Sequence, residues 1–510
     1  MISRRSFVQW AASAYASTSL PSSVFAQLAH STPSATHPES EDDLLRWVDP
    51  SIGTGGHGHC YPGATVPFGA VQLSPDTYND EWDWCSGYHI TDTSIMGFSH
   101  THLSGTGCGD LLDFLVMAGT GPVRLAPGSR ANPTEGYRSR FSHAHEHAEP
   151  GFYSVFLDDP KVLVELTATD RTGLHRYTFQ QGGDVWLILD LSHSYLRSGG
   201  SSVFFSELAH PSPTTLRGSR VTCAWAWRRP CAFSMDVSKT PLRIDFYSED
   251  KLVDATAFSD GKLQGDNLKA VLHFRTMPGE AILVRTGISG VSAEGAARNL
   301  LAEQPAWDFP ATRAAAQAKW RDQLGRIRAS ITDPGQKRTF YTALYHMSLG
   351  PTLYDDVDGQ YLGMDKRVHT LPAGQRNYTC FSLWDTFRAA HPAYTLIQTD
   401  RVPHFVNTLL RMAHESPEGV PVWPLQSVET GGMTGYHSAS VVAEALRKGI
   451  PGIDAEAAYQ AFWRRSMAEN FRGMGYYREM GYLPADRESE SVSESFEYCY
   501  DDWAISNLAQ

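Results

Sequence analysis

The chain of 510 residues is short of basic side chains. Its 43 Lys and Arg stand against 56 Asp and Glu, which gives a formal net charge of -13. Nucleic acids and anionic membranes are bound through clustered Lys and Arg, so this balance argues against both as partners. An enzyme that acts on neutral polymers is compatible with the same charge.

Cysteine pairs with metal or redox spacing are also missing. The sequence has 7 Cys, and no two of them form a C-x-x-C pair. Zinc ribbons and thioredoxin-like redox sites depend on that spacing, so the sequence supports neither. The odd number leaves at least one cysteine outside any disulfide within the chain.

No run of apolar residues approaches the length of roughly 20 that a membrane span requires. The apolar stretch at 8–20 is too short, but it follows Arg4 and Arg5 and precedes small residues that end at Ala26. This order predicts a twin-arginine export signal over 1–26 and a soluble protein that is periplasmic or secreted. The alternative is a chance Arg-Arg pair near the N-terminus.

Composition divides the rest of the chain into a linker, a β-rich part and a helical part. Ser, Thr, Pro, His and Glu fill 27–43, which predicts a flexible linker. Short β-branched and aromatic runs separated by Gly, Pro and Asp predict a β-sandwich domain over 44–290. A helical linker is expected over 291–332, and helices dominate 333–510. The clearest strand candidates are 153–157, 162–166, 175–179 and 185–189.

Residues typical of helix ends place the helices more closely. Helices are expected at 293–304, at 312–331, from Asp400 as the N-cap through Glu415, from Ser438 to Lys448 with Gly449 as the stop, and from Asp454 onward.

The last expected helix reaches the end of the chain without a C-cap. Ser493 opens it, and Phe496, Trp503 and Ile505 give it an apolar face that needs a neighbour. One interpretation is that the chain stops in the middle of a domain. The other is that a terminal helix docks on the existing body, and the helix alone favours neither.

Histidines gather in and after a glycine-rich segment at 52–69. His57 and His59 lie in it, and His100 and His102 follow downstream. Imidazoles two residues apart can share a metal, but no carboxylate or thiolate stands at metal spacing. Hydrogen bonds to sugar hydroxyls or to the backbone are therefore preferred, which makes His59 and His102 candidate substrate-binding residues.

Aromatic and polar residues alternate in later segments. The stretches 82–89 and 97–107 combine stacking planes with hydrogen-bond partners, as a carbohydrate site needs, although a core edge with polar turns has a similar composition. Asp385 stands between Trp384 and Arg388. It can hold two adjacent sugar hydroxyls, or it can pair with Arg388 at i,i+3 spacing.

Several long segments together resemble successive signatures of glycoside hydrolase family 92, in the order of that family. They are 53–77, 82–89, 97–110, 345–365, 381–402 and 491–503. The resemblance implies an N-terminal β-sandwich, a helical linker and an (α/α)6 toroid with the active site between sandwich and toroid. It also implies a bound Ca²⁺ and exo-hydrolysis of α-mannoside glycans with inversion.

The resemblance carries over to individual residues. Trp384 and Asp385 match a pair that contacts the terminal mannose, and Trp82 matches a tryptophan near the next sugar. Glu429 and His437 fall in a further matching segment. There the family usually has Gly-Asn before Glu-Thr, whereas this chain has Ser-Val, so the contact from Glu429 departs from the pattern.

By the same resemblance, the catalytic acid and base and the principal calcium ligands are expected beyond Gln510, which makes the toroid incomplete. No catalytic or metal-ligating residue is therefore assigned. The leading hypothesis is an exo-α-mannosidase, with α-1,2 as the favoured linkage, of which these residues alone lack activity; the sequence does not give the linkage preference. The alternatives are a non-catalytic mannoside-binding remnant, one half of an enzyme with a separate C-terminal half, or a hydrolase or phosphorylase of similar architecture that acts on another sugar.

Overall fold

The structure is a computed structural model that describes residues 43–196, 200–254, 256, 258–469 and 471–509. The predicted export signal at 1–26 lies outside the described residues, as does the predicted linker at 27–43 apart from Asp43. From Leu44 onward the chain forms one unit. No helix in its described part is both long and apolar enough to cross a membrane.

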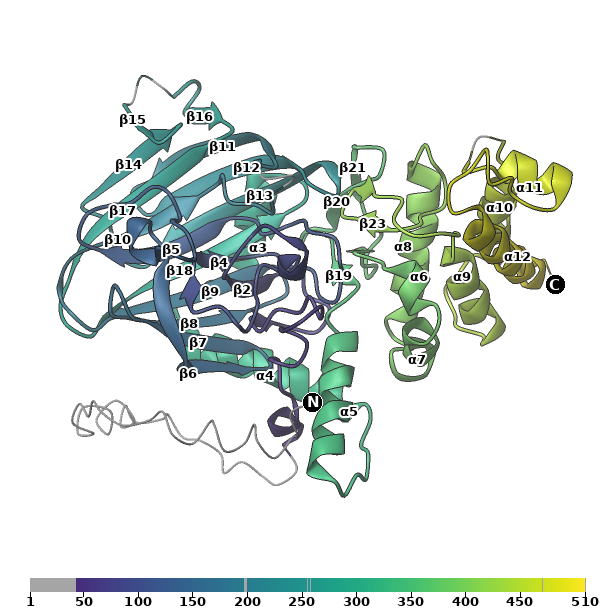
Figure 1. Cartoon of the computed structure of the whole chain (residues 1–510), viewed down its shortest axis with the longest axis horizontal. Helices are drawn as coiled ribbons and strands as arrows, with labels where there is room; N and C mark the ends of the chain where they lie inside the picture. Colours follow the sequence, from purple (N-terminus) through teal and green to yellow (C-terminus); the bar gives the residue numbers. More distant parts are fainter. Residues whose placement is uncertain (1–42, 197–199, 255, 257, 470, 510) are drawn as a thin grey trace, which may run out of the picture. The chain divides into compact units, whose positions relative to one another are not determined.

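Two antiparallel sheets make up the first half of this unit (Figure 1). The eight-stranded sheet has the order β1 (Ala64–Thr65), β2 (Gln72–Asp76), β4 (Gly97–Ser99), β5 (Leu115–Thr120), β10 (Gly183–Asp190), β17 (Leu268–Thr276), β14 (Arg243–Ser248) and β15 (Lys251–Val253). The ten-stranded sheet has the order β16 (Lys262–Gly265), β11 (Val203–Ser212), β12 (Thr215–Cys223), β13 (Trp227–Val237), β18 (Glu280–Ser289), β9 (Thr172–Phe179), β8 (Val162–Ala168), β7 (Phe152–Leu157), β6 (Ser139–Glu149) and β3 (Ser94–Ile95). Short 3-10 helices lie at Leu44–Trp47, Trp82–Trp84 and Pro133–Glu135.

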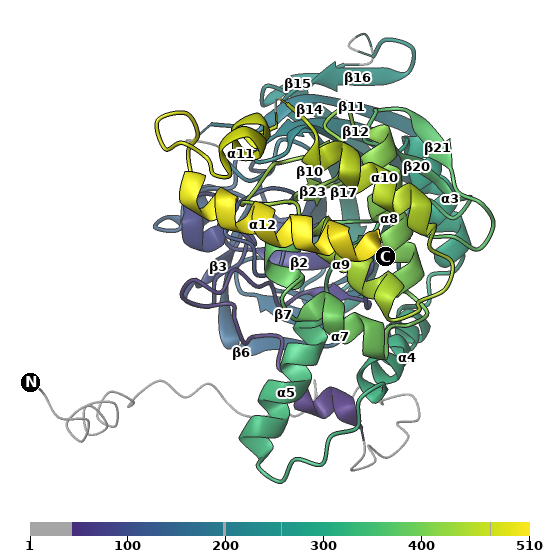
Figure 2. The same cartoon turned by 90° about the vertical axis from the view of Figure 1, so that its right-hand side faces the viewer.

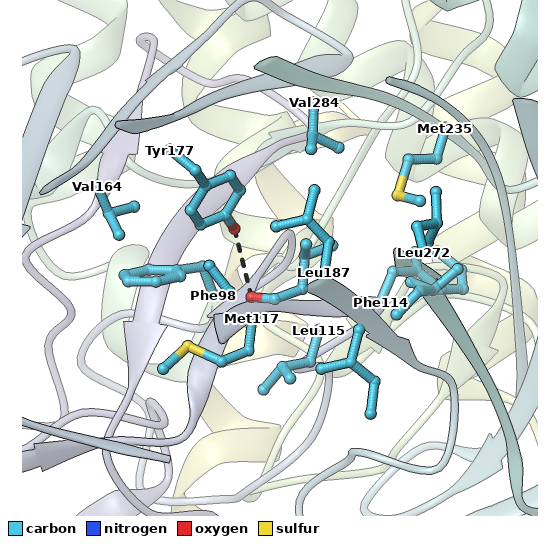
Figure 3. Packing of buried hydrophobic residues seen from close by; sticks show 14 of the residues in the cluster. Phe98, Phe114, Leu115, Met117, Val164, Tyr177, Leu187, Met235, Leu272 and Val284 are labelled. Carbon is cyan, nitrogen blue, oxygen red and sulfur yellow. Dashed lines mark hydrogen bonds between the residues drawn. The ribbon is translucent and has the colours of Figure 1, made fainter. Parts of the chain in front are cut away.

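The two sheets enclose one hydrophobic core. Side chains alternate between buried and partly exposed along β12, as expected for a strand with one face on a core. Figure 3 shows Met117 and Leu187 of one sheet facing Val164 and Val284 of the other. The hydroxyl of Tyr177 donates to the carbonyl of Val116 across this core at 3.5 Å. The predicted strands and the β-sandwich are confirmed.

Two helices cover part of the ten-stranded sheet. The α3 helix (Ala293–Glu303) packs on β18 and β13, and α4 (Phe309–Gly325) packs on β7 and β8. The indole of Trp320 in α4 donates to the carbonyl of Thr65 at 2.7 Å, which ties the helix to the sandwich. Helix α4 ends at Gly325, six residues before the predicted end. The residues after it bond to α5 instead, since the hydroxyl of Tyr341 accepts from the N–H of Ala329 at 3.2 Å and donates to the carbonyl of Ile327 at 3.3 Å.

The remaining residues are mainly helical, as predicted (Figure 1). The helices are α5 (Pro334–Met347), α6 (Leu383–Thr386), α7 (Ala390–Ile397), α8 (Val402–Glu415), α9 (Ser438–Arg447), α10 (Ala455–Ser466), α11 (Met474–Met480) and α12 (Ser491–Leu508). Three two-stranded antiparallel sheets interrupt them: β19 (Thr352–Leu353) with β22 (Tyr378–Thr379), β20 (Gln360–Leu362) with β21 (Val368–Thr370), and β23 (Pro424–Leu425) with β24 (Val428–Glu429).

The predicted helix caps are correct in part. Asp454 accepts from the backbone N–H of Ala457, and Gly449 follows α9 with a φ of +70°. Asp400 is not a cap, because its carboxylate forms an ion pair with Arg326 at 2.7 Å. The helix instead follows Arg401, whose side chain makes no capping hydrogen bond.

The last helix starts at Ser491, before the predicted position. It packs along α9 and α10, as Figure 2 shows. Ile505 is buried in this contact, whereas Phe496 and Trp503 are 74% and 60% exposed. The helix therefore docks on the body through one face only.

A buried ionic network joins the sandwich to the helical part. The guanidinium of Arg229 on β13 donates to Asp110 at 2.9 Å and to both oxygens of Asp113 at 2.9 and 3.0 Å. Arg220 on β12 donates to Asp113 at 2.9 Å. All four side chains are fully buried. Arg229 also donates to the amide oxygen of Gln426 in the helical part at 3.2 Å.

The network depends on the balance of its charges. Burial acts to raise the pKa of Asp113, but the two guanidinium groups outweigh it and hold that pKa far below its ordinary value. A buried charge that loses its partner is strongly destabilising. The 110–113 segment, β12 and β13 are therefore fixed to one another.

Replacement of Arg229 by Met is expected to lower the free energy of unfolding by about 3–5 kcal/mol, because Asp110 and part of Asp113 then remain buried without a counter-charge. Urea unfolding followed by circular dichroism measures this. Arg275→Met is the control, since Arg275 and its partner Asp184 are 76% and 81% exposed, and a change within about 0.5 kcal/mol is expected there. Equal effects of the two substitutions would contradict the role of the network.

Candidate carbohydrate site

The predicted site residues fall into two groups in the structure. Trp384, Asp385, Glu429 and His437 lie in the helical part, on α6, β24 and the residue before α9. Trp82, His59 and His102 lie in loops and short elements of the sandwich.

The indole of Trp384 is held at its edge and on one face. Its Nε1 donates to Oε1 of Glu497 on α12 at 3.0 Å. The guanidinium of Arg388 lies over the ring, 4.5 Å from the centroid. This cation–π contact occupies one face of the indole, and Trp384 as a whole is partly exposed.

Asp385 is exposed and has one oriented oxygen. The hydroxyl of Ser382 donates to Oδ2 of Asp385 at 2.5 Å and accepts from Nε1 of Trp423 at 3.0 Å. Among the described residues Oδ1 has no hydrogen bond, so it is available as an acceptor. The alternative pair of Asp385 with Arg388 does not form, because Arg388 instead stacks on Trp384 and Phe387.

His437 is buried between two carboxylates. Its Nδ1 lies 2.9 Å from Asp501, and its Nε2 lies 3.2 Å from Oε2 of Glu497. The second contact is close enough for an ion pair but is out of line for a hydrogen bond, since Nε2 has no hydrogen-bond partner among the described residues. The ring stacks on Phe387 with centroids 4.2 Å apart. Both ring nitrogens of His437 already face protein groups. Contact of His437 with a substrate therefore stays a prediction.

Glu497 was not among the predicted site residues, although it contacts two of them. It precedes Asp501 by one helical turn on α12, so both carboxylates lie on the same face and meet His437. This i,i+4 pair of acids is a signal in the sequence, but its histidine partner lies about 60 residues away and only the fold supplies it.

Glu429 binds backbone rather than standing free. Its Oε1 accepts from the N–H groups of Trp423 at 2.9 Å and Gly431 at 2.7 Å, and its Oε2 accepts from Val422 at 2.9 Å. Burial raises the pKa of Glu429, while these backbone donors act in the opposite direction. The carboxylate therefore shapes the loop that carries Trp423, and a contact with a sugar stays a prediction.

Glu429→Gln is expected to loosen this loop, because an amide NH₂ cannot accept from the N–H of Val422. An unsatisfied buried donor costs about 1–3 kcal/mol, so amide exchange over 421–431 is expected to quicken by roughly 10-fold or more. Hydrogen exchange with mass spectrometry measures this. Glu418→Gln is the control, since Glu418 is an exposed residue of the same loop. Unchanged exchange in Glu429→Gln would contradict this role.

Trp82 forms an exposed aromatic surface on the sandwich. It is 53% exposed, and its Nε1 donates to the carbonyl of Gly107 at 2.9 Å. His59 meets the indole edge-on with centroids 4.6 Å apart. The ring of His59 is buried, burial lowers its pKa, and its Nε2 has no partner among the described residues. Nε2 of His59 thus lacks a hydrogen-bond partner among the described residues, and about half of Trp82 is exposed.

His102 is a structural residue in this geometry. Its Nδ1 lies 2.7 Å from the carbonyl of Gln72, and its Nε2 lies 2.8 Å from Asp76, whose other oxygen lies 2.8 Å from His193. His100 meets His175 at 3.0 Å instead. The histidines thus do not converge, and the described residues include no group of three or more His, Cys, Asp or Glu that could hold a metal. A hydrogen bond from His102 to a sugar stays a prediction.

The Asp76 carboxylate is expected to make stability depend on acid pH. Burial would raise its pKa, but His102 and His193 lower it to about 2. A carboxyl whose pKa falls on folding contributes stability above its unfolded pKa of about 3.9 and loses it as pH falls toward 2. The ionised Asp76 carboxylate is expected to contribute about 2 kcal/mol to the free energy of unfolding at neutral pH. Urea unfolding between pH 2 and 6 measures the free energy of unfolding. As pH falls, this free energy is expected to decrease less for Asp76→Asn than for the wild type, and an equal decrease in the two proteins would contradict the role of Asp76.

A pocket of about 150 Å³ is lined by residues of both the sandwich and the helical part, and His102 is the one predicted site residue in its lining. The sandwich contributes His102, Ser104 and Thr106, and the helical part contributes Ser382 and Trp423. Trp423 also packs edge-on against Trp225, which follows β12, with centroids 4.5 Å apart. Ser382 therefore links the pocket wall to the carboxylate of Asp385.

Comparison with known proteins defines the class of this fold and site. The family model described as the glycosyl hydrolase family 92 N-terminal domain matches residues 47–289, and the family 92 catalytic domain matches residues 295–510. The chain belongs to glycoside hydrolase family 92.

Individual relatives agree with this assignment. A family GH92 α-mannosidase from Bacteroides thetaiotaomicron, solved with mannoimidazole, is 39% identical, with a TM-score of 0.88 over 92% of this chain and 61% of that chain. A family GH92 inverting mannosidase from the same species is 27% identical, with a TM-score of 0.79 over 92% and 63% of the two chains. An uncharacterized secreted glycosidase from Arthroderma benhamiae is 23% identical over 92% of this chain and 60% of that protein. The chain thus spans about three fifths of the length of these relatives.

Proposed function

We propose that this protein acts on α-mannosides and contributes to hydrolysis of a terminal mannose with inversion. The observation that carries the proposal is the exposed carboxylate of Asp385, oriented by Ser382 beside the indole of Trp384. A sugar needs a stacking plane and a fixed acceptor for its hydroxyls, and these two side chains supply both. Membership of family 92 and the two mannosidase relatives support mannose as the sugar.

In this proposal each predicted residue has a role in binding. Asp385 accepts hydrogen bonds from hydroxyls of the terminal mannose, and the face of Trp384 opposite Arg388 stacks on the ring. Trp82 stacks on the next sugar, and an α-1,2 linkage is the proposed preference. Inverting hydrolysis needs two carboxyl groups roughly 6.5–9.5 Å apart. Asp385, Glu429, Glu497 and Asp501 are not proposed as that acid and base, since each has a binding or structural contact.

Calcium remains part of the proposal through the family resemblance alone. Among the residues that the structure describes, no group of three or more His, Cys, Asp or Glu could hold a metal ion. No metal is therefore included in the roles proposed for Trp384, Asp385 and Trp82.

Export is proposed from the sequence. Arg4 and Arg5 precede an apolar stretch, and a relative from Arthroderma benhamiae is named as a secreted glycosidase. A periplasmic or secreted location reached by the twin-arginine route is consistent with both, and fractionation of cells that carry Arg4→Lys together with Arg5→Lys tests the route.

The proposal predicts that Asp385→Ala weakens binding of α-1,2-mannobiose by about 10- to 100-fold, because hydrogen bonds to a charged group contribute about 1.5–3 kcal/mol. Isothermal titration calorimetry measures the affinity. Release of mannose, assayed with Ca²⁺ and with EDTA, is measured in parallel. Asp358→Ala is the control, since Asp358 is an exposed residue paired with Arg298.

The outcomes separate the candidate functions. Release of mannose by the wild-type chain supports a hydrolase. Binding without release supports a mannoside-binding protein or one half of a two-part enzyme with a separate C-terminal half. Absence of both binding and release, or an Asp385→Ala protein that binds as the wild type does, overturns the proposal.

A further inference from the structure

The carboxylate of Glu497 is the meeting point of three side chains. Its Oε1 accepts from Nε1 of Trp384 at 3.0 Å and lies 3.6 Å from the guanidinium of Arg388. Its Oε2 lies 3.2 Å from Nε2 of His437. The three partners come from α6, the residues directly after it and the start of α9, so one group on α12 connects all of them.

Glu497 is itself held in place. Its side chain is only 17% exposed, and that of His437 is 1% exposed. His437 is fixed on its other side by Asp501, which also accepts from the backbone N–H of Tyr436 at 2.8 Å. A partly buried carboxylate that faces several such groups keeps one rotamer, because every alternative rotamer gives up several contacts at once.

The arrangement determines the orientation of the Trp384 indole. Glu497 fixes the direction of the N–H, and Arg388 covers one face of the ring. Arg388 also lies 4.7 Å from the centroid of Phe387, which stacks on His437. The indole therefore belongs to a cluster with Glu497, Arg388, Phe387 and His437.

We infer that Glu497 is a positioning residue that sets the plane of Trp384 for stacking on the terminal sugar, and that it acts through its negative charge. This inference rests on the proposed function for its ligand, but the geometry concerns this chain alone. The charge matters because Arg388 and His437 both face the carboxylate. A glutamine whose oxygen takes the place of Oε1 retains an acceptor for the indole N–H, but it has no charge to attract Arg388, and its NH₂ group takes the place of Oε2 beside His437.

A double-mutant cycle tests the inference. Glu497→Gln is expected to weaken binding of α-1,2-mannobiose by about 10-fold in the wild-type background and by less than about 2-fold in a Trp384→Phe background, where no indole remains to be oriented. A residue that only stabilises the fold would cost the same in both. Glu444→Gln is the control, since Glu444 pairs with Lys448 on the surface of α9.

A second readout needs no ligand. Glu497→Gln is expected to change the near-ultraviolet circular dichroism of tryptophan in the wild-type background and to leave it unchanged in Trp384→Phe. Glu497→Asp, which keeps the charge on a shorter side chain, is expected to retain more affinity than Glu497→Gln and replaces it if that variant fails to fold.

The outcomes remain distinct from those of the proposed function. Failure of the wild type to bind α-1,2-mannobiose overturns the proposed function, while the spectroscopic cycle still tests the position of the indole. Normal binding by Glu497→Gln, or equal effects of Glu497→Gln in both backgrounds in either cycle, overturns the role of Glu497.

Discussion

The buried contact of Arg229 with Asp110 and Asp113 is the constraint on which the arrangement of the site depends. These charges cannot separate without leaving an unpaired ion in the core. The same Asp110 accepts from the backbone N–H of Ala226, next to Trp225, and Arg229 donates to Gln426. One ionic cluster thus fixes the sandwich segments that approach the helical part, and with them the wall of the pocket.

The helical part follows the same rule. Two of its ionizable side chains are engaged with other protein groups: His437 with Asp501 and Glu497, and Glu429 with three backbone N–H groups. Because buried charges are tolerated only when they are paired or hydrogen-bonded, these side chains serve to place their neighbours. Asp385 differs, since it is exposed and keeps one oxygen free of hydrogen bonds among the described residues. That difference is the reason why Asp385 is proposed to bind the sugar and the other side chains are not.

Local patterns predicted the fold well where the cause is local. The strand at 162–166 alternates buried and partly exposed positions because one face meets the core, and periodicity of two reports this directly. Asp454 caps a helix because its own carboxylate reaches the next turn. Asp400 has the same chemistry but pairs with Arg326, 74 residues away, and no local pattern contains that information. The early end of α4 is a similar case.

The sequence by itself determined the family, the order of a β-sandwich and a helical part, and the residues from which a sugar site is drawn, because these depend on composition, periodicity and long motifs. Only the tertiary structure decided which of those residues are engaged. His102 pairs with Asp76, Glu429 binds backbone, and Glu497, absent from the predicted set, holds Trp384. The physical reason is that a histidine or carboxylate has the same chemistry in a support as in a binding site, and only its partners, supplied by distant parts of the chain, distinguish the two.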